Sequence, residues 1–279
     1  MGPWIGVHGI GQQYCSRDEI LKRWIPALSG GVEWATQCRI QPDLDLAFYG
    51  HLFRKAEPLR TGKGPAGSDS VADLADLDEA ELADLTAAVE EIVTADDLAE
   101  AATRPPKAVT WLPVPVQTLV GAVERRFPPA SGVLFMGTMR QVRRYLRDPQ
   151  LKSEVDQIAA GAASGADVLI GHSLGSVVAY EFLRQNPGHS VRLLLTLGSP
   201  LGLKMVRDRL PAGAPGVHRW VNVRDPNDPV TAAGALDRWY PVAEDGYADN
   251  GLKAHQAERY LNCKATGAAL EDFLTEPGR

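Results

Sequence analysis

The sequence predicts an α/β fold in which a mostly parallel sheet is flanked by helices and interrupted by a helical insertion. Short apolar runs recur along the chain, as at residues 4–7, 167–170 and 191–197. Their length and continuous apolar character are typical of strands buried on both faces of a parallel sheet. Stretches with the 3.6-residue spacing of amphipathic helices separate these runs. The alternation of the two patterns predicts the fold class.

A change of composition divides the chain into two parts. Strand and helix patterns alternate in residues 1–52 and again in residues 149–279, whereas residues 53–148 contain helical, acidic, proline-broken and basic stretches. We therefore expect one α/β core built from the two outer segments. The middle segment is expected to form a helical cap or lid.

Size and charge limit the functional classes. With 279 residues, 44% of them hydrophobic, the chain can bury the core of one large domain and still carry an insertion. The net charge is -6, and the sequence contains no cluster of Lys and Arg dense enough to follow a phosphate backbone. Nucleic acid is therefore not expected as a partner. No apolar run is long enough to span a bilayer.

The three cysteines, Cys15, Cys38 and Cys263, are odd in number and widely spaced. Such spacing matches neither a zinc site nor a redox motif, and it predicts ordinary thiols in a reducing compartment. The chain enters its first apolar run at once, without the charged and apolar regions of a signal peptide. The sequence therefore predicts a cytoplasmic protein.

The first elements follow from local patterns. Residues 4–7 predict a strand, and the glycine-rich residues 8–11 predict a tight loop after it. A helix is expected over residues 18–28, with Ser16 as its N-cap. Residues 44–49 predict the next strand, and a strand, helix and strand in this order form a right-handed parallel unit.

The insertion contains two halves of opposite charge. Residues 61–68 predict a turn-rich link, and residues 69–100 predict one or two amphipathic helices with acidic outer faces. Residues 104–147 are broken by prolines and then become basic. Pairing of the two halves would form the cap, and an alternative use of the apolar and basic half is docking on a partner or a membrane surface.

The second half of the chain returns to the alternating pattern. A helix is expected over residues 151–163, followed by strands near residues 167–170, 191–197 and 217–223. Residues 239–242 are expected to form the last strand. Because Pro241 lacks a backbone N–H, this strand would lie at the edge of the sheet.

A serine lies at the sharpest predicted turn of the sheet. Residues 171–175 read GHSLG and fit the pattern G-x-S-x-G, between a predicted strand and a predicted helix. In this pattern the serine occupies a strained strand-to-helix turn, and glycines flank it because a β-carbon would collide there. Ser173 is therefore the candidate nucleophile.

Two motifs resemble the α/β-hydrolase superfamily, in particular its lipase-like and esterase-like serine hydrolases. They are GHSLG at residues 171–175 and VHGIG at residues 7–11, and the resemblance covers residues 4–50 and 151–261. It implies an oxyanion hole formed by the backbone amides of Ile10 and Leu174. Because no strand is predicted before residue 4, the chain resembles either a compact variant that lacks the first strands or a chain with a trimmed N-terminus. Caps in this family often enclose the acyl group.

The resemblance also implies where the other two catalytic groups lie. A serine hydroxyl needs a base, and the base needs a carboxylate to hold its tautomer. The family places the histidine after the last strand, which points to His255, whereas His8 and His172 are interpreted as packing or supporting residues. The acid follows an earlier strand, where both Asp225 and Asp228 occur.

We favour Asp228 over Asp225 for the acid. Asp225 directly follows the strand and precedes a proline, where an aspartate commonly shapes a turn through its own backbone. Asp228 lies further out, and its Asp-Pro-Val sequence resembles the acid loop of several lipase groups.

Two classes of function remain open. The favoured one is hydrolysis of a carboxylic ester of a small-molecule acyl substrate, through an acyl-enzyme on Ser173 and with no metal or organic cofactor. Thioesters and amides are related substrates for the same three residues. The alternative is a catalytically silent fold that acts as a binding or partner module.

Overall fold

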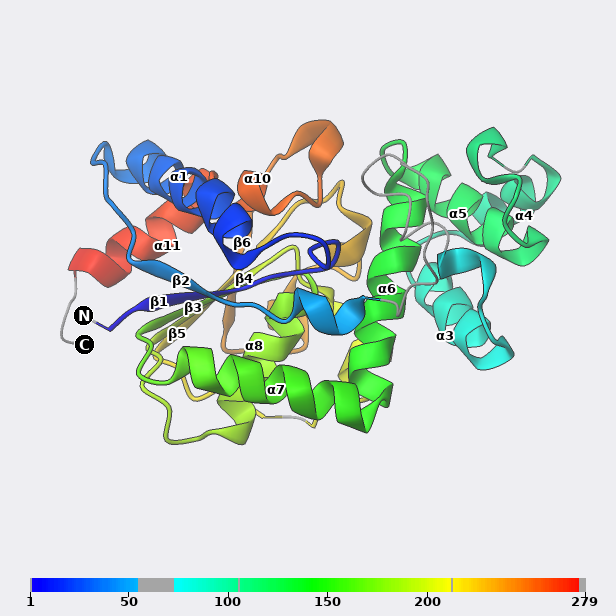
Figure 1. The fold of residues 1–279 in the computed structure, drawn as a ribbon. Coiled ribbons are helices and arrows are strands. Elements are labelled where there is room, and N and C mark those ends of the chain that lie inside the picture. Colours follow the sequence, from blue (N-terminus) through cyan, green and yellow to red (C-terminus); the bar gives the residue numbers. More distant parts are fainter. Residues whose placement is uncertain (1, 55–72, 105, 212, 276–279) are drawn as a thin grey trace.

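The computed structural model describes residues 2–54, 73–104, 106–211 and 213–275 (Figure 1). In this part of the chain, six strands form one sheet in the order β2-β1-β3-β4-β5-β6, and every neighbouring pair is parallel. The predicted α/β class is therefore confirmed. The strands are β1 Trp4–Val7, β2 Leu44–Ala47, β3 Val168–His172, β4 Leu193–Leu197, β5 Arg219–Arg224 and β6 Ala243–Tyr247.

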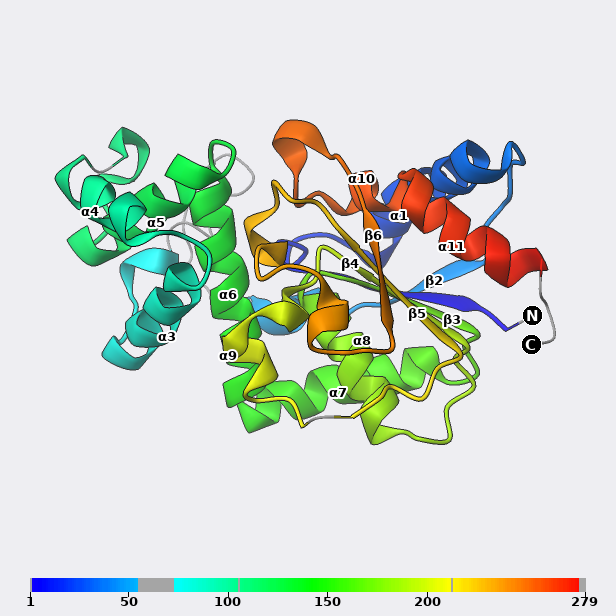
Figure 2. The same cartoon turned by 180° about the vertical axis from the view of Figure 1, so that it is seen from behind.

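Helices cover both faces of the sheet (Figures 1 and 2). The first face carries α1 (Arg17–Thr36), α10 (Ala257–Leu261) and α11 (Lys264–Thr275), and the second carries α7 (Pro149–Ala163) and α8 (Leu174–Gln185). Successive residues of a strand point to opposite faces, so each strand contributes to two apolar cores. On β3, for example, Ile170 joins the core under α1 and Leu169 joins the core under α8.

Helix α1 is longer than the sequence pattern predicts. Its N-cap is Ser16, as expected, and Glu19 completes a capping box with it. The helix continues through Pro26 and two glycines to Thr36. A β-carbon at Gly31 would lie 2.2 Å from the carbonyl oxygen of Leu261, so glycine allows the helix to pack closely against the C-terminal segment. This close packing offsets the weak helix propensity of the segment.

In the described residues of the insertion, every secondary-structure element is a helix. The insertion lies beyond the carboxyl ends of the strands (Figure 1). Residues 61–68, predicted as a link, lie outside the described residues. The elements are η2 Asp73–Ala75, α3 Glu79–Glu90, α4 Ala95–Thr103, η3 Lys107–Val109, α5 Val114–Arg126 and α6 Ser131–Arg147.

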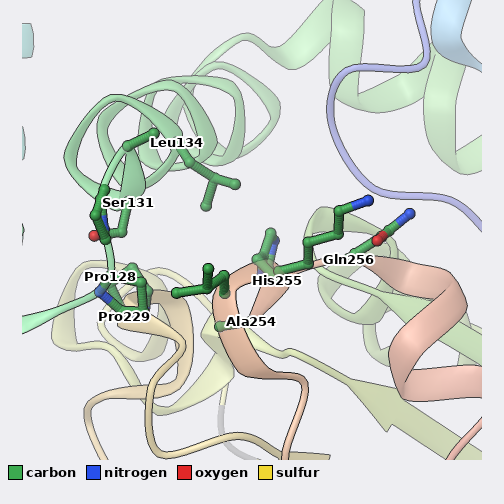
Figure 3. Close-up of a pocket in the computed structure, with 11 residues that line it drawn as sticks. Pro128, Ser131, Leu134, Pro229, Ala254, His255 and Gln256 are labelled. Carbon is green, nitrogen blue, oxygen red and sulfur yellow. The ribbon is translucent and has the colours of Figure 1, made fainter.

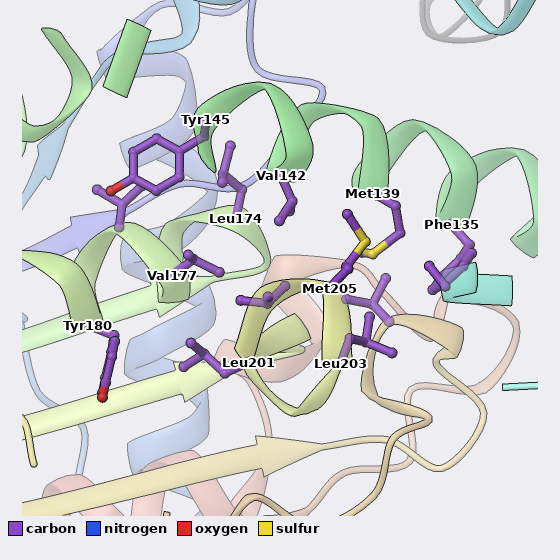
Figure 4. Packing of buried hydrophobic residues seen from close by; sticks show 14 of the residues in the cluster. Phe135, Met139, Val142, Tyr145, Leu174, Val177, Tyr180, Leu201, Leu203 and Met205 are labelled. Atoms are coloured by element: carbon purple, nitrogen blue, oxygen red, sulfur yellow. The ribbon is translucent and has the colours of Figure 1, made fainter. Parts of the chain in front are cut away.

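Helix α6 joins the insertion to the rest of the molecule. Its buried side chains Phe135, Met139 and Val142 belong to the same apolar cluster as Leu174 and Met205 (Figure 4). The core under α8 therefore continues without a break into the insertion. Apolar contact fixes the insertion over the end of the sheet.

The acidic and basic halves of the insertion do pair with each other. Arg140 lies 3.2 Å from Glu81, and Arg143 and Arg147 lie 2.7 and 2.9 Å from Asp84. These ion pairs hold α3 against α6. The expected pairing between the two halves is thus observed.

The predicted last strand is wrong in position. Residues 239–242 form no strand, and the edge strand is β6, which begins two residues after Pro241. Tyr240 instead turns inward and packs its ring 5.2 Å from that of Trp220 and 5.4 Å from that of Tyr180. Strand β6 reads AEDGY, a polar sequence that gives no apolar signal, because one side of an edge strand is exposed. No helix in the described ranges is both long and apolar enough to cross a membrane.

Candidate active site

The turn between β3 and α8 holds Ser173 in a strained conformation. The φ and ψ angles of Ser173 are 54° and -126°, a region that residues with a β-carbon rarely occupy. A β-carbon at Gly171 would lie 2.5 Å from the Cα of Ser176, and one at Gly175 would lie 1.9 Å from the carbonyl oxygen of Val7. Both flanking glycines are therefore required by close backbone approach.

Three side chains distant in the sequence meet at this turn. The Oγ of Ser173 lies 2.8 Å from Nε2 of His255, and Nδ1 of His255 lies 2.7 Å from Oδ2 of Asp228. All three residues are buried. Because the carboxylate is an acceptor, Nδ1 carries the proton of the neutral imidazole and Nε2 is free to accept the serine proton. The hydroxyl, imidazole and carboxylate thus form one continuous hydrogen-bonded chain.

The structure separates the two candidate aspartates by their partners. Both are fully buried, but the carboxylate of Asp225 accepts backbone N–H groups, from Asn227 at 2.8 Å and from Asn250 at 2.7 Å. Burial raises the pKa of Asp225 above its ordinary value. Asp228 alone of the two contacts His255. Asp225 ties the loop after β5 to the loop that precedes His255.

The two amides proposed for an oxyanion hole lie on two segments beside Ser173, the loop after β1 and the start of α8. A β-carbon at Gly9 would lie 2.7 Å from the β-carbon of Ser173, so the loop that carries Ile10 runs directly past the serine. Leu174 is the first residue of α8, where a backbone N–H has no acceptor within the helix. Within the described part of the chain, neither amide donates to another protein group. Both are therefore available to an acceptor from outside the protein.

His8 fixes the loop that carries Ile10. Its Nδ1 donates to the carbonyl oxygen of Gly9 at 2.8 Å, and its Nε2 accepts the N–H of Tyr49 at 3.1 Å. The hydroxyl of Tyr49 donates to the carbonyl oxygen of His8. Burial lowers the pKa of His8 to about 4, so the ring is neutral and keeps this tautomer. His8 is a supporting residue of the loop.

His172 supports the histidine loop in the same way. Its Nε2 lies 3.0 Å from the carbonyl oxygen of His255 and donates to it. Burial lowers the pKa of His172 well below its ordinary value, which keeps the ring neutral. The residue that precedes Ser173 thus also holds the backbone of His255.

Sequence reasoning missed two residues beside the carboxylate. Tyr260 on α10 donates its hydroxyl to Oδ2 of Asp228 at 2.8 Å. Gly198, which follows β4, has a φ angle of 56°, and a β-carbon there would lie 3.2 Å from Oδ2 of Asp228 and 3.3 Å from Nδ1 of His255. Gly198 directly follows an apolar run, and a glycine in that position is a signal in the sequence for a tight turn at the end of a strand. No sequence pattern marks Tyr260.

Two cavities meet at His255, with volumes of about 450 and 700 Å³. The smaller cavity lies between the start of α6, including Leu134, and the loop that contains Ala254 (Figure 3). The larger one is lined by Ile10 and reaches Glu124 on α5. The turn between α5 and α6 contributes to both. The walls shared by the two cavities are Pro129, Ala130, Leu134, His255 and Gln256.

No site for a metal ion stands out in the described ranges, where His, Cys, Asp and Glu side chains form no group of three or more that could hold one. Comparisons of the chain with family models, curated proteins and solved structures return no match. The functional assignment therefore depends on the geometry around Ser173.

Proposed function

We propose that the protein is a serine hydrolase of the α/β-hydrolase type that cleaves carboxylic esters. One observation carries this proposal: a serine on a strained strand-to-helix turn lies 2.8 Å from an imidazole whose other nitrogen lies 2.7 Å from a buried carboxylate. Such a chain activates a hydroxyl that is otherwise a weak nucleophile. The six-stranded parallel sheet, with the serine at the carboxyl end of β3, is consistent with this fold type.

In the first half of the reaction, Ser173 forms an ester with the acyl group. His255 takes the hydroxyl proton on Nε2 while Oγ attacks the carbonyl carbon, and Asp228 stabilises the resulting imidazolium. The amides of Ile10 and Leu174 donate to the oxyanion of the tetrahedral intermediate. When this intermediate collapses, the bond to the alcohol oxygen breaks and His255 returns its proton to the leaving alcohol.

In the second half, water releases the acyl group. His255 removes a proton from the water, whose oxygen attacks the acyl carbon, and the same two amides stabilise the second oxyanion. Collapse of this intermediate breaks the bond to Ser173, and Oγ takes the proton from His255. The products are a carboxylic acid and the original enzyme, with all atoms balanced and no cofactor consumed.

The two cavities offer space for a small-molecule substrate beside His255, and Ser173 lies buried behind that histidine without lining either cavity. The cavities meet at His255, the group that must reach both Ser173 and the leaving oxygen. Their volumes are in the range of pockets that bind small molecules. Thioesters and amides would follow the same steps, since only the leaving atom differs.

A fluorophosphonate probe tests the proposal, because it forms a covalent bond with an activated serine. We expect the wild-type protein to be labelled and the Ser173→Ala variant to be unlabelled. Ester hydrolysis by this variant should fall by about 10⁶-fold, as when a catalytic serine is removed. Ser190→Ala is the matched control, because Ser190 bonds only to the carbonyl oxygen of Ala166 among the described contacts.

Intact-protein mass spectrometry measures the labelling, and circular dichroism shows that each variant is folded. Labelling that persists in Ser173→Ala would contradict the assignment of the nucleophile. A folded wild-type protein that is not labelled would instead favour a catalytically silent binding module.

A further inference from the structure

The hydroxyl of Tyr260 occupies a central position behind the candidate triad. Tyr260 is fully buried on α10. Its hydroxyl donates to Oδ2 of Asp228 at 2.8 Å and accepts the backbone N–H of Asp225 at 3.1 Å. The same Oδ2 accepts the Nδ1 proton of His255 at 2.7 Å. One carboxylate oxygen therefore serves two donors, the imidazole and the phenol.

The phenol remains a donor at all pH values at which the protein would work. Burial, together with the negative charge of Asp228 and the hydrogen bond to it, raises the pKa of Tyr260 well above its ordinary value. Tyr260 therefore keeps its proton. The hydrogen bond to Asp228 is of the charge-assisted kind, which is stronger than a bond between neutral groups.

We propose that Tyr260 is a positioning residue that orients the Asp228 carboxylate and sets the pH at which His255 becomes a competent base. This inference rests on the proposed function of the same site. No motif in the sequence assigns a role to Tyr260. The role follows from the two donors that share Oδ2.

The effect on His255 has a definite direction. A hydrogen bond from the phenol disperses the negative charge of Oδ2, so less of that charge is available to stabilise an imidazolium beside it. Removal of the phenol would concentrate the charge on the contact with His255. The imidazole would then hold its proton to higher pH, and the enzyme would lose its free base over that range.

Removal of the phenol would also change how the Asp228 carboxylate and the neighbouring backbone are held. Oδ1 of Asp228 is fixed by the N–H of Val230 at 3.0 Å. Without the hydroxyl, Oδ2 keeps only its contact with His255, and the buried N–H of Asp225 loses its acceptor. The carboxylate is then held by fewer contacts, so the imidazole beside it is positioned less exactly and the maximal rate falls.

Two other titratable groups near the imidazole also lie beside Tyr260: the ring centroid of His172 lies 6.0 Å from that of Tyr260, and the backbone N–H of Asp225 donates to the Tyr260 hydroxyl. His172 on β3 lies with its ring centroid 4.9 Å from that of His255, and burial keeps it neutral. Asp225 has both carboxylate oxygens bonded to backbone N–H groups. The charged side chains that face His255 across the two cavities are Arg23, Glu124, Lys253 and Glu258.

The test compares Tyr260→Phe with Tyr145→Phe. Tyr145 is a matched control, because it is also fully buried and also donates its hydroxyl to an aspartate, Asp156, at 2.6 Å. The measured quantity is kcat/KM for p-nitrophenyl acetate from pH 5 to 9. We expect the acid limb of the Tyr260→Phe profile to move up by about 0.5 to 1 pH unit and the maximum to fall about 10-fold. The Tyr145→Phe profile should keep the wild-type midpoint.

A second variant covers the case in which Tyr260→Phe does not fold. Site-specific replacement of Tyr260 by 3-fluorotyrosine keeps the hydroxyl and makes it a stronger donor. The acid limb should then move to lower pH. A role in stability alone predicts no displacement of the midpoint, so a wild-type midpoint in the folded variants would overturn the inference.

A measurement without turnover separates this inference from the proposed function. The ring of His255 can be titrated by NMR in the protein labelled with ¹⁵N-histidine. If the wild-type protein is neither labelled by fluorophosphonate nor active, the proposed function fails. A titration midpoint of His255 that still rises in Tyr260→Phe would support the role of Tyr260, and an unchanged midpoint would contradict it.

Discussion

The end of the sheet and the helical insertion both line the same two cavities. Different interactions stabilise each of these two regions internally. At the end of the sheet, backbone groups approach so closely that glycine is required, as at Gly171 and Gly175. The insertion contains a close backbone approach too, because a β-carbon at Gly132 on α6 would lie 2.4 Å from the carbonyl oxygen of Val120 on α5, but ion pairs such as Arg143 with Asp84 at 2.7 Å also hold its helices together. Close backbone approach thus sets the turn around Ser173, whereas long charged side chains contribute to holding α3 against α6.

This difference suggests a division of labour. The groups proposed to react need positions fixed to fractions of an ångström, which rigid strands and tight turns provide. The side chains that line the cavities need only to leave a space of suitable size and shape. Helices joined by side chains can be reshaped without disturbing the contact between Ser173 and His255, and the following three predictions test this separation.

The largest effect is expected from Gly175→Ala at the end of the sheet. The new β-carbon would lie 1.9 Å from the carbonyl oxygen of Val7, a backbone atom that cannot move without shifting β1. We expect a loss of about 3 kcal/mol or more in the free energy of unfolding, or no folded protein.

The control for this prediction is Gly161→Ala on α7, where nothing lies within 4 Å of the new β-carbon. Helix propensity should make that variant more stable by about 0.5 to 1 kcal/mol. Urea unfolding followed by circular dichroism measures both changes. Wild-type stability of Gly175→Ala would show that the strand-to-helix turn is not sterically closed.

A smaller effect is expected from Arg143→Met in the insertion. The Arg143 side chain is 11% exposed and lies 3.6 Å from Glu81 as well as 2.7 Å from Asp84. Its removal leaves largely buried carboxylates with fewer partners, so we expect a loss of about 2 to 3 kcal/mol in the free energy of unfolding. Labelling of Ser173 by a small fluorophosphonate should persist.

Arg125→Met provides the matched control in the same insertion. Arg125 is 40% exposed and pairs with the exposed Glu100 and, at 3.9 Å, with Asp97, so its loss should cost no more than about 0.5 to 1 kcal/mol. Thermal unfolding and labelling rates are measured for both variants. Loss of labelling in folded Arg143→Met would contradict the separation between the insertion and the reacting groups.

The smallest predicted effect is a pH dependence from His8. The pKa of His8 falls from 6.5 to about 4 in the folded protein because the ring is buried. Between these values the unfolded chain binds more protons than the folded one, so stability falls as the pH is lowered from 6.5 towards 4 and is level above 6.5. His8 should contribute a loss of about 2 kcal/mol between pH 7 and pH 5.

Urea unfolding at the two pH values measures this contribution, with His8→Gln as the comparison. Glutamine keeps one donor and one acceptor but does not titrate. The free energy of unfolding of the His8→Gln variant should therefore change by about 2 kcal/mol less between pH 7 and pH 5 than that of the wild-type protein. Equal pH dependence in the two proteins would show that His8 is not neutral in the folded state.

The sequence predicted the parts of the molecule that depend on local or ordered signals. Ser173 is marked by flanking glycines whose steric cause lies within a few residues, and β3 and β4 are marked by continuous apolar runs. The order implied by the family resemblance pointed to His255 and to Asp225 or Asp228, and Asp228 was preferred because it lies further from the strand and its Asp-Pro-Val sequence resembles the acid loop of several lipase groups. The structure brings these three side chains together, and their catalytic role stays a prediction.

The sequence could not predict contacts that depend on tertiary packing. Tyr260 reaches Asp228 across 32 residues, and nothing in its neighbourhood distinguishes it from a core tyrosine. Strand β6 was missed because its polar side chains are matched by partners on β5, as when Asn222 donates to Asp245 at 2.7 Å. The full length of α1 depends on glycines that matter only when the C-terminal segment packs against them.

The turn between α5 and α6 acts as a partition between two compartments. It supplies Pro129 and Ala130 to both cavities, and Leu134 in the first turn of α6 also lines both. Ala130 adopts a left-handed conformation with a φ angle of 66°. A substitution in these few residues would resize both compartments at once and leave the reacting groups untouched. For the proposed hydrolase, this turn is therefore the place at which substitutions are expected to change substrate preference.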